Sequence, residues 1–218
     1  MINPVRADTV ISGILESPNE TRTVEFKPSF QWPKNIKALQ NSPKAQEAIK
    51  TILALSNTAD GGKIILGVEK DSSKERYILK GMKRTDLRTF DHDLIFDHVR
   101  NFGRPDPRFQ VLNTQFSTKN FIIFSVQSFT FSPIICRNYK NLQKLEDAAI
   151  YIRTHKPETK KISEPWEMKE LIDLTVDKEI DLLTPRIKGI IKGIGQVPVS
   201  ATPEEDEDKF LEELKDIL

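Results

Sequence analysis

The segment from Ala45 to Val68 constrains the fold more than any other part of the 218-residue chain. Its first half has the i, i+3, i+4, i+7, i+8 spacing of an amphipathic helix, with apolar residues at Ala45, Ala48, Ile49, Ile52 and Leu53. Asp60-Gly61-Gly62 then provides a glycine stop for the helix. The β-branched run from Lys63 to Val68 follows directly. We predict one helix–turn–strand unit with a central strand, followed by a polar turn through Ser73.

Alternating and periodic patterns predict the elements around this unit. Residues 21–27 alternate with a period of two, which predicts a half-buried strand with Val24 and Phe26 on one face and Glu25 and Lys27 on the other. Similar patterns predict helices at 91–102 and 166–183 and strands at 109–112, 120–126 and 148–153. Because these elements alternate irregularly and show no fixed repeat, we predict an α+β fold, a single domain with a mixed β-sheet and packed helices.

The C-terminal part of the chain differs in composition from the rest. Pro185 to Gly195 holds three glycines, which predicts a linker, and residues 196–218 hold eight acidic and two basic residues. This tail carries a net charge of −6, and the remainder carries +7. We therefore predict a domain at 1–184 and a linker with an acidic amphipathic appendage at 185–218. The basic remainder favours a polyanionic partner.

No apolar run in the sequence is long enough to span a membrane, and residues 1–13 lack the apolar core of a secretory signal. We expect a cytoplasmic protein without a membrane partner. The single cysteine, Cys136, excludes an internal disulfide and a cysteine-rich zinc site. It lies in an apolar stretch, which predicts a buried thiol without a chemical role.

Three motifs follow one another along the chain. The first is Glu20-Thr-Arg-Thr-Val-Glu25-Phe-Lys27, the second runs from Ala54 through Asn57 and Gly61-Gly62 to Gly67-Val68, and the third is Ala149-Ile-Tyr151-Ile152-Arg153. In this order and spacing they resemble the Schlafen AlbA family of divergent AlbA-like nucleic-acid-binding domains. The resemblance covers about residues 18–183 and implies a single-lobed, stand-alone AlbA-like domain.

The resemblance also implies a carboxylate cluster, because the nuclease branch of the family uses the two glutamates of the opening motif, here Glu20 and Glu25. Clustered carboxylates hold Mg²⁺ or Mn²⁺, which stabilises the charge that develops when a phosphodiester is cut. Lys27 lies on the strand face of Glu25 and is suited to the scissile phosphate. For the carboxylates to converge, Glu20 must lie in the turn before the strand. A solvated Glu-x-Lys face is the competing interpretation.

The resemblance also implies a third carboxylate, just after the predicted strand that ends at Gly67-Val68. The matching position falls on or beside Lys70, which is flanked by Glu69 and Asp71. Either neighbour is a candidate metal ligand, and Glu69 is the preferred catalytic one because Asp71 lies further into the turn.

A basic turn follows the last predicted strand. The candidates for contacts to phosphates and bases are Arg153, His155, Lys156, Lys160, Lys161 and Tyr151. An ordinary basic loop is the competing interpretation. A second cluster, Arg100, Arg104 and Arg108, carries less weight because the neighbouring prolines explain it as a rigid connector.

These observations lead to one predicted function and two alternatives. We predict a metal-dependent endoribonuclease that cuts structured, tRNA-like RNA with Mg²⁺ or Mn²⁺. The first alternative is a non-catalytic DNA- or RNA-binding regulatory module, which does not require three carboxylates to converge. The second is an adaptor whose C-terminal tail docks on a protein partner. Whether DNA is also bound, and whether two chains form a homodimer, stays open.

Overall fold

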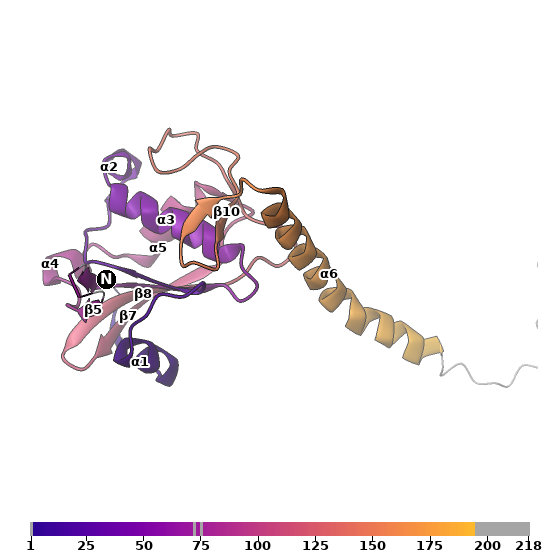
Figure 1. Cartoon of the computed structure of the whole chain (residues 1–218), viewed down its shortest axis with the longest axis horizontal. Helices are drawn as coiled ribbons and strands as arrows, with labels where there is room; N and C mark the ends of the chain where they lie inside the picture. The colour runs from indigo at the N-terminus through magenta and orange to yellow at the C-terminus, as the bar shows by residue number, and fades with distance from the viewer. Residues whose placement is uncertain (1, 72, 75, 195–218) are drawn as a thin grey trace, which may run out of the picture. The chain divides into compact units, whose positions relative to one another are not determined.

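The computed structural model describes residues 2–71, 73–74 and 76–194 (Figure 1). The chain divides into two units, Met1–Thr175 and Val176–Leu218. The helices are α1 (Thr9–Glu16), α2 (Ile36–Gln40), α3 (Pro43–Ser56), α4 (Arg84–Leu87), α5 (His92–Arg100) and α6 (Pro165–Ile194). The strands are β1 (Pro4–Arg6), β2 (Val24–Lys27), β3 (Gly62–Leu66), β4 (Val68–Asp71), β5 (Arg76–Leu79), β6 (Gly103–Arg104), β7 (Phe109–Phe116), β8 (Lys119–Val126), β9 (Ile135–Cys136), β10 (Tyr151–Arg153) and β11 (Thr159–Lys161).

Five strands of the first unit form one sheet in the order β1-β7-β8-β3-β2. The pairs β1–β7 and β2–β3 are parallel, whereas β3–β8 and β7–β8 are antiparallel. The other strands form the two-stranded sheets β4–β5, β6–β9 and β10–β11. The mixed sheet and its helices confirm the predicted α+β class, and β3 lies between two neighbours, as predicted for a central strand.

Alternate residues of β3 point to opposite faces of the sheet and build two cores. Ile64 and Leu66 belong to the larger core, which includes residues of α3 and α5. Ile65 belongs to the smaller core, together with Ile11 and Leu15 of α1. Figure 1 shows α3 and α5 on one side of the sheet and α1 on the other. The sheet is therefore covered on both faces.

Strand β2 shows the predicted alternation. Val24 and Phe26 are buried in the smaller core, on the α1 side. Glu25 and Lys27 point to the opposite face, where each side chain is only 15% exposed. An acid and a cation are thus held together on the α3 side of an edge strand.

The glycine pair after α3 does more than end the helix. Gly61 has a φ of 70°, and a Cβ added there would lie 2.1 Å from the carbonyl oxygen of Val126. A Cβ on Gly62 would lie 2.4 Å from the carbonyl oxygen of Thr23. The turn is therefore in direct backbone contact with β8 and with the residue before β2, which only glycine permits.

The buried side chain of Asn57 joins the end of α3 to β10. Its amide nitrogen donates to the carbonyl oxygens of Ile134 and Tyr151, both at 2.9 Å. Its amide oxygen accepts a hydrogen bond from the backbone nitrogen of Ile134 at 2.7 Å. One of these buried hydrogen bonds fixes β10 against the end of the helix, and the other two fix the segment at Ile134 beside it.

Several elements lie where the sequence patterns predict none. Helix α2 forms in the polar stretch before α3, and Asn35 caps it by accepting a hydrogen bond from Ala38 N at 2.9 Å. A polar turn was expected after β3, but β4 and β5 form a hairpin there. Its inner face is apolar, with Val68 buried and Leu79 packed beside it. Lys70 on the inner face and Ile78 on the outer face interrupt the alternation, so the sequence does not show it.

Helix α6 is longer than the sequence predicts. The prediction ends it near Leu183 and begins a linker at Pro185, but the helix continues to Ile194. Pro185 lies inside the helix, where it removes one backbone hydrogen bond without ending the helix. The acidic tail at 196–218 lies outside the described residues. Among the described helices, none has the length and apolar character needed to cross a membrane.

The buried titratable side chains of the first unit include Cys136 and His98. Cys136 is buried, as predicted, and burial together with the nearby acids Asp147 and Glu146 raises the pKa of its thiol to about 12. His98 of α5 accepts a hydrogen bond at Nδ1 from Trp32 Nε1, at 3.2 Å. Burial lowers the pKa of His98 below its ordinary value of 6.5, so the ring is neutral at neutral pH.

We expect the stability of the domain to fall as the pH drops below about 6.5, because the unfolded chain then protonates His98 while the folded chain resists protonation. Above that pH both states are neutral and the contribution vanishes. Urea unfolding of the wild type and His98→Asn, at about pH 7.5 and pH 5.5, measures the effect. The asparagine oxygen keeps an acceptor for Trp32 but does not titrate. An equal pH dependence in wild type and His98→Asn would contradict the assignment, and His92→Asn, at an exposed position, is the matched control.

Candidate functional site

An ion-pair network joins the first and third sequence motifs. The carboxylate of Glu25 forms one ion pair with Lys27 Nζ, at 2.8 Å, and a second with the guanidinium of Arg153. Arg153 lies 128 residues away in the sequence and its side chain is fully buried. A buried arginine with a carboxylate partner is tolerated because the pairing offsets the loss of hydration. Strand β2, which carries the first motif, is therefore joined to β10 by a buried ion pair.

The other donors of Arg153 are also satisfied. Its guanidinium donates to the carbonyl oxygens of Thr21 at 3.0 Å and Arg22 at 3.3 Å. A further hydrogen bond reaches Thr159 Oγ1 of β11 at 3.2 Å. We predicted that Arg153 contacts phosphate, but in this structure it is enclosed by protein and holds the turn before β2. The sequence shows an arginine in a strand but not the partner that buries it.

Glu20 lies in the turn before β2, where convergence with Glu25 requires it. Its carboxylate accepts a hydrogen bond from Phe26 N at 3.0 Å. Tyr77 of β5 lies beside it, with its ring 5.0 Å from that of Phe26. Burial and the nearby carboxylates of Glu20 and Glu25 raise the pKa of Tyr77 to about 12. Glu20 of the opening motif thus lies against the hydroxyl of Tyr77, which sequence reasoning missed because Tyr77 belongs to the unpredicted hairpin.

The two candidates for the third acid, Glu69 and Asp71, have partners other than Glu20 and Glu25. Glu69 pairs with Lys80 at 3.6 Å. Asp71 accepts a hydrogen bond from Ser73 Oγ at 2.6 Å, which lowers the pKa of its carboxyl group. Residues directly opposite each other in an antiparallel pair share a face, and Lys70 is opposite Tyr77. Lys70 therefore shares the hairpin face of Tyr77, and its acidic neighbours point to the other face.

Within the described residues, no group of three or more histidine, cysteine, aspartate or glutamate side chains is arranged to hold a metal ion. Glu25 is already neutralised by two cations, and Glu69 and Asp71 have their own partners. The four predicted ligands, as they are placed, do not fit a hard divalent cation, which requires several oxygen ligands around one point. The Mg²⁺ or Mn²⁺ site stays a prediction, and no chemical step is derived from it.

A small pocket adjoins the ion-pair network. It has a volume of about 300 Å³ and is lined by Lys27, Pro28, Phe30, Pro43, Lys44, Glu47 and Lys144. Lys27 is thus shared between the pocket and the pair with Glu25. Lys44 and Lys144 were not predicted, because they lie in distant parts of the chain and look like ordinary surface lysines in the sequence. We call Lys27, Lys44 and Lys144 the lysine rim.

The predicted basic turn is mostly paired with acids. Lys160 lies 2.5 Å from Glu167, and Lys161 forms an ion pair with Glu146. The imidazole of His155 lies 3.8 Å from Glu170, whereas Lys156 is exposed.

Tyr151, which we predicted as a stacking surface, is buried against α3. Lys50 Nζ lies 5.2 Å from the centre of its ring, and its hydroxyl oxygen accepts a hydrogen bond from Glu146 N at 2.7 Å. The ring is therefore not available to a base in this structure.

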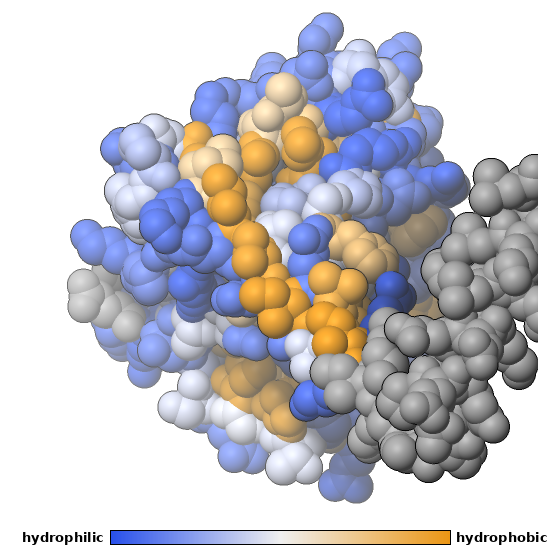
Figure 2. All heavy atoms as spheres, turned by 90° about the vertical axis from the view of Figure 1, so that its right-hand side faces the viewer, coloured by the Kyte–Doolittle hydropathy of each residue, from blue (hydrophilic) through white to orange (hydrophobic). Residues whose placement is uncertain are grey.

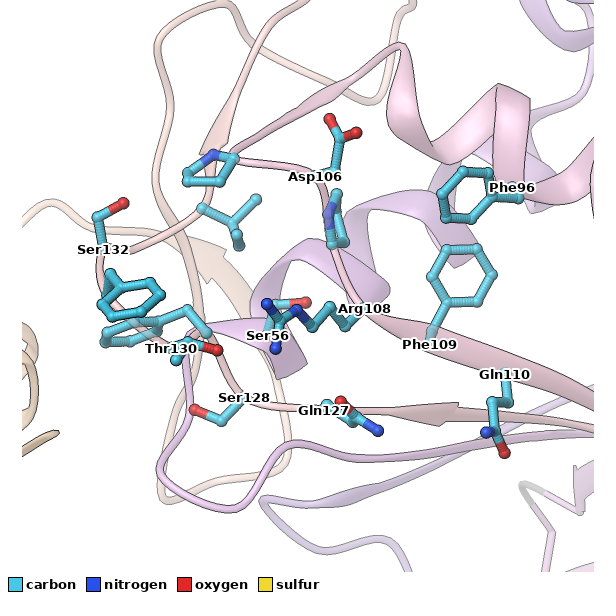
Figure 3. A pocket seen from close by; sticks show the side chains of 15 residues that line it. Ser56, Phe96, Asp106, Arg108, Phe109, Gln110, Gln127, Ser128, Thr130 and Ser132 are labelled. Carbon is cyan, nitrogen blue, oxygen red and sulfur yellow. The ribbon is translucent and has the colours of Figure 1, made fainter. Parts of the chain in front are cut away.

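A second, larger pocket of about 510 Å³ lies at the ends of β7 and β8 (Figure 3). Arg108 extends into it, and Phe96 and Phe109, with ring centres 6.0 Å apart, form part of its wall. Arg100 and Arg104 both pair with Asp106, at 2.9 Å and 2.7 Å, on the connector that we predicted from the prolines. Among these arginines only Arg108 contributes its side chain to the pocket.

Residues 20–162 match the Schlafen AlbA_2 family. The chain belongs to this family. Among solved structures it is similar to the DIP2311 protein from Corynebacterium diphtheriae, with 16% identity and a TM-score of 0.44 over 70% of this chain and 25% of that one. It is also similar to the N-terminal domain of a RecG-related protein from Nitrosomonas europaea, with 16% identity and a TM-score of 0.40 over 70% of this chain and 91% of that one. The chain thus corresponds to a quarter of the DIP2311 protein. No curated protein matches it.

In this Schlafen AlbA_2 domain the three sequence motifs meet. Glu25 of the first motif pairs with Arg153 of the third. The side chain of Asn57, in the second motif, donates a hydrogen bond to the backbone of the third motif. The glycine turn of the second motif leaves room for the backbone of Thr23 in the first. The resemblance seen in the sequence therefore has a structural basis, because the motif residues hold one another in place. The lysine rim lies beside this junction.

We expect Arg153→Met to destabilise the domain by about 3–5 kcal/mol, because it leaves the Glu25 carboxylate largely buried with one partner fewer. Adding both Glu25→Leu and Lys27→Met to that variant should recover part of the loss, since none of the three charges of the network then remains. Urea unfolding of both variants measures the difference. The exposed pair between Lys161 and Glu146 is the control, and Lys161→Ala should cost less than about 1 kcal/mol. A loss of similar size in Arg153→Met and Lys161→Ala would show that the buried pair has no special role.

Proposed function

We propose that this Schlafen AlbA_2 domain binds nucleic acid, RNA in particular, and that the lysine rim contacts the phosphate backbone. The observation that carries the proposal is that Lys27, Lys44 and Lys144 line one pocket, in which Lys27 also pairs with Glu25 and Lys144 lies 3.9 Å from Glu47. The family includes nucleic-acid-binding and nuclease-like members, which supports the same conclusion. The net positive charge of the chain outside its acidic tail also favours binding to a polyanion.

The chemistry of the pocket suits a sugar–phosphate backbone. Lysine ammonium groups are flexible point charges that bind phosphates without demanding one geometry. Phe30, Pro28 and Pro43 supply apolar surface between these charges, which suits a ribose or a base edge. Lys27 is held by its ion pair with Glu25, which in turn pairs with Arg153. The pocket thus offers contacts to the sugar–phosphate backbone, which position a nucleic acid without selecting its sequence.

We expect Lys44→Ala and Lys144→Ala to weaken binding to a labelled hairpin RNA and to reduce the slope of log K against log salt by about 0.7–0.9 for each phosphate that is no longer neutralised. Fluorescence anisotropy over a series of salt concentrations measures both. Arg6→Ala is the matched control, because β1 and β2 are at opposite edges of the sheet. An unchanged slope in the Lys44→Ala/Lys144→Ala variant would contradict the proposal. A reduced slope in a variant with Lys156, Lys160 and Lys161 all changed to Ala would place the RNA at the basic turn.

RNA cleavage is a second candidate function, supported by the nuclease-like members of the family and by the contact of Glu20 with Tyr77. The missing element is a third carboxylate on that face, where Lys70 stands. We therefore favour binding without cleavage. The adaptor function predicted for the tail concerns residues outside the described part of the chain and stays a prediction.

We expect the wild type to bind labelled tRNA and single-stranded RNA in Mn²⁺ and to leave both intact over hours, with the same result in a chelator. Gel analysis of the RNA, paired with a binding assay, checks this. Cleavage that requires Mn²⁺ and is lost in Glu20→Gln and Glu25→Gln, with binding retained, would establish the nuclease instead. Lys70→Glu tests whether the third acid is the limiting element, because it restores a carboxylate on the face of Tyr77.

A further inference from the structure

Helix α6 carries most of the exposed large apolar side chains in the described part of the chain. Four of them, Val176, Ile180, Leu183 and Ile187, are 47%, 54%, 49% and 53% exposed. Figure 2 shows apolar side chains gathered in a band among hydrophilic ones. Exposed aliphatic residues in a row are unusual on a monomer, because each leaves apolar surface in water. We call these four residues the α6 stripe.

The spacing of the α6 stripe is that of a helix that packs against another helix. The residues follow one another at intervals of four, three and four, which places them on one side of the helix and matches the core positions of a coiled coil. Pro185 lies on the opposite side, where it does not interfere with packing. A helix that contains Pro185 and Gly189 has poor intrinsic stability and depends on burial of its apolar face.

Charges beside the α6 stripe are divided along the helix. Glu179 and Arg186 lie on the same flank of the stripe, seven residues apart. If two such helices align in the same direction, Glu179 faces Thr184 of the other copy and gains no charged partner. If they align in opposite directions, Glu179 faces the partner's Arg186, and the reverse pair forms by symmetry. The charge pattern is therefore complementary to a second copy of itself only in the antiparallel arrangement.

We propose that two copies of this chain associate through the α6 stripe as an antiparallel helix pair. In the register that sets Ile180 against the partner's Leu183, Val176 packs against the partner's Ile187 and both Glu179–Arg186 pairs form. The two-fold axis makes the interface self-complementary, so it closes at a dimer. Four core residues from each copy make a small interface, for which we expect a dissociation constant of about 1–100 μM. The pairing is independent of nucleic-acid binding.

The first test is sedimentation equilibrium of the full chain over a range of concentrations. We expect a reversible monomer–dimer equilibrium in the wild type and loss of the dimer in Leu183→Asp. Leu182→Asp is the matched control, because Leu182 is exposed on α6 but lies off the stripe. Circular dichroism at high and low concentration checks that the helix itself is retained. A wild type that stays monomeric at all concentrations, or a dimer that survives Leu183→Asp, overturns the proposal.

The second test distinguishes the antiparallel pair from any other apolar contact. We expect Glu179→Arg alone and Arg186→Glu alone each to weaken self-association about tenfold, because each creates two like-charged pairs. Mixing the two variants should restore association as a heterodimer, since every flanking pair is then opposite in charge. Asp181→Arg, outside the flank, is the control. Equal self-association of all variants overturns the antiparallel arrangement. Dimerisation that appears only after deletion of residues 195–218 also overturns the proposal, since the tail is then the occupant of the stripe in the full chain.

Discussion

The ion pair between Glu25 and Arg153 is the interaction on which the arrangement of the domain depends. Strand β2 is at the edge of the five-stranded sheet and has a neighbour on one side only. The buried guanidinium of Arg153 holds β2 in place where a second neighbouring strand is missing. It binds the side chain of Glu25 and two carbonyl oxygens of the preceding turn. The position of Glu20 follows from this turn. The position of Lys27, and with it the edge of the lysine-rimmed pocket, follows from the strand.

The sequence predicts those parts of the fold whose cause is local. The alternation of Val24 to Lys27, the helical stripe of α3 and the glycine turn after it depend on neighbours within a few residues, and each is present as predicted. Helix α6 was predicted with the wrong end, because Pro185 is a helix breaker in most contexts and the sequence does not show when a helix tolerates it.

The candidate site is less predictable, because its geometry comes from distant parts of the chain. Glu20 and Glu25 were recognised from a motif, but the partner of Glu25 is 128 residues away and had been assigned to phosphate binding. A side chain in a strand can point to a ligand or to another strand, and only packing decides between them. No sequence pattern indicates that Lys44 and Lys144 belong to the site. A surface lysine becomes part of a site only through the residues that the fold brings beside it.

The trio of Lys27, Glu25 and Arg153 has a consequence for the electric field of the domain. It holds two positive charges and one negative charge, so one unit of positive charge is fixed at a largely buried place. Mobile ions screen charges on the open surface but reach a buried group poorly. As ionic strength rises, attraction between exposed charges fades first, whereas the ion pairs within the trio are screened much less. The trio therefore keeps β2 attached to β10 at salt concentrations where exposed ion pairs have weakened.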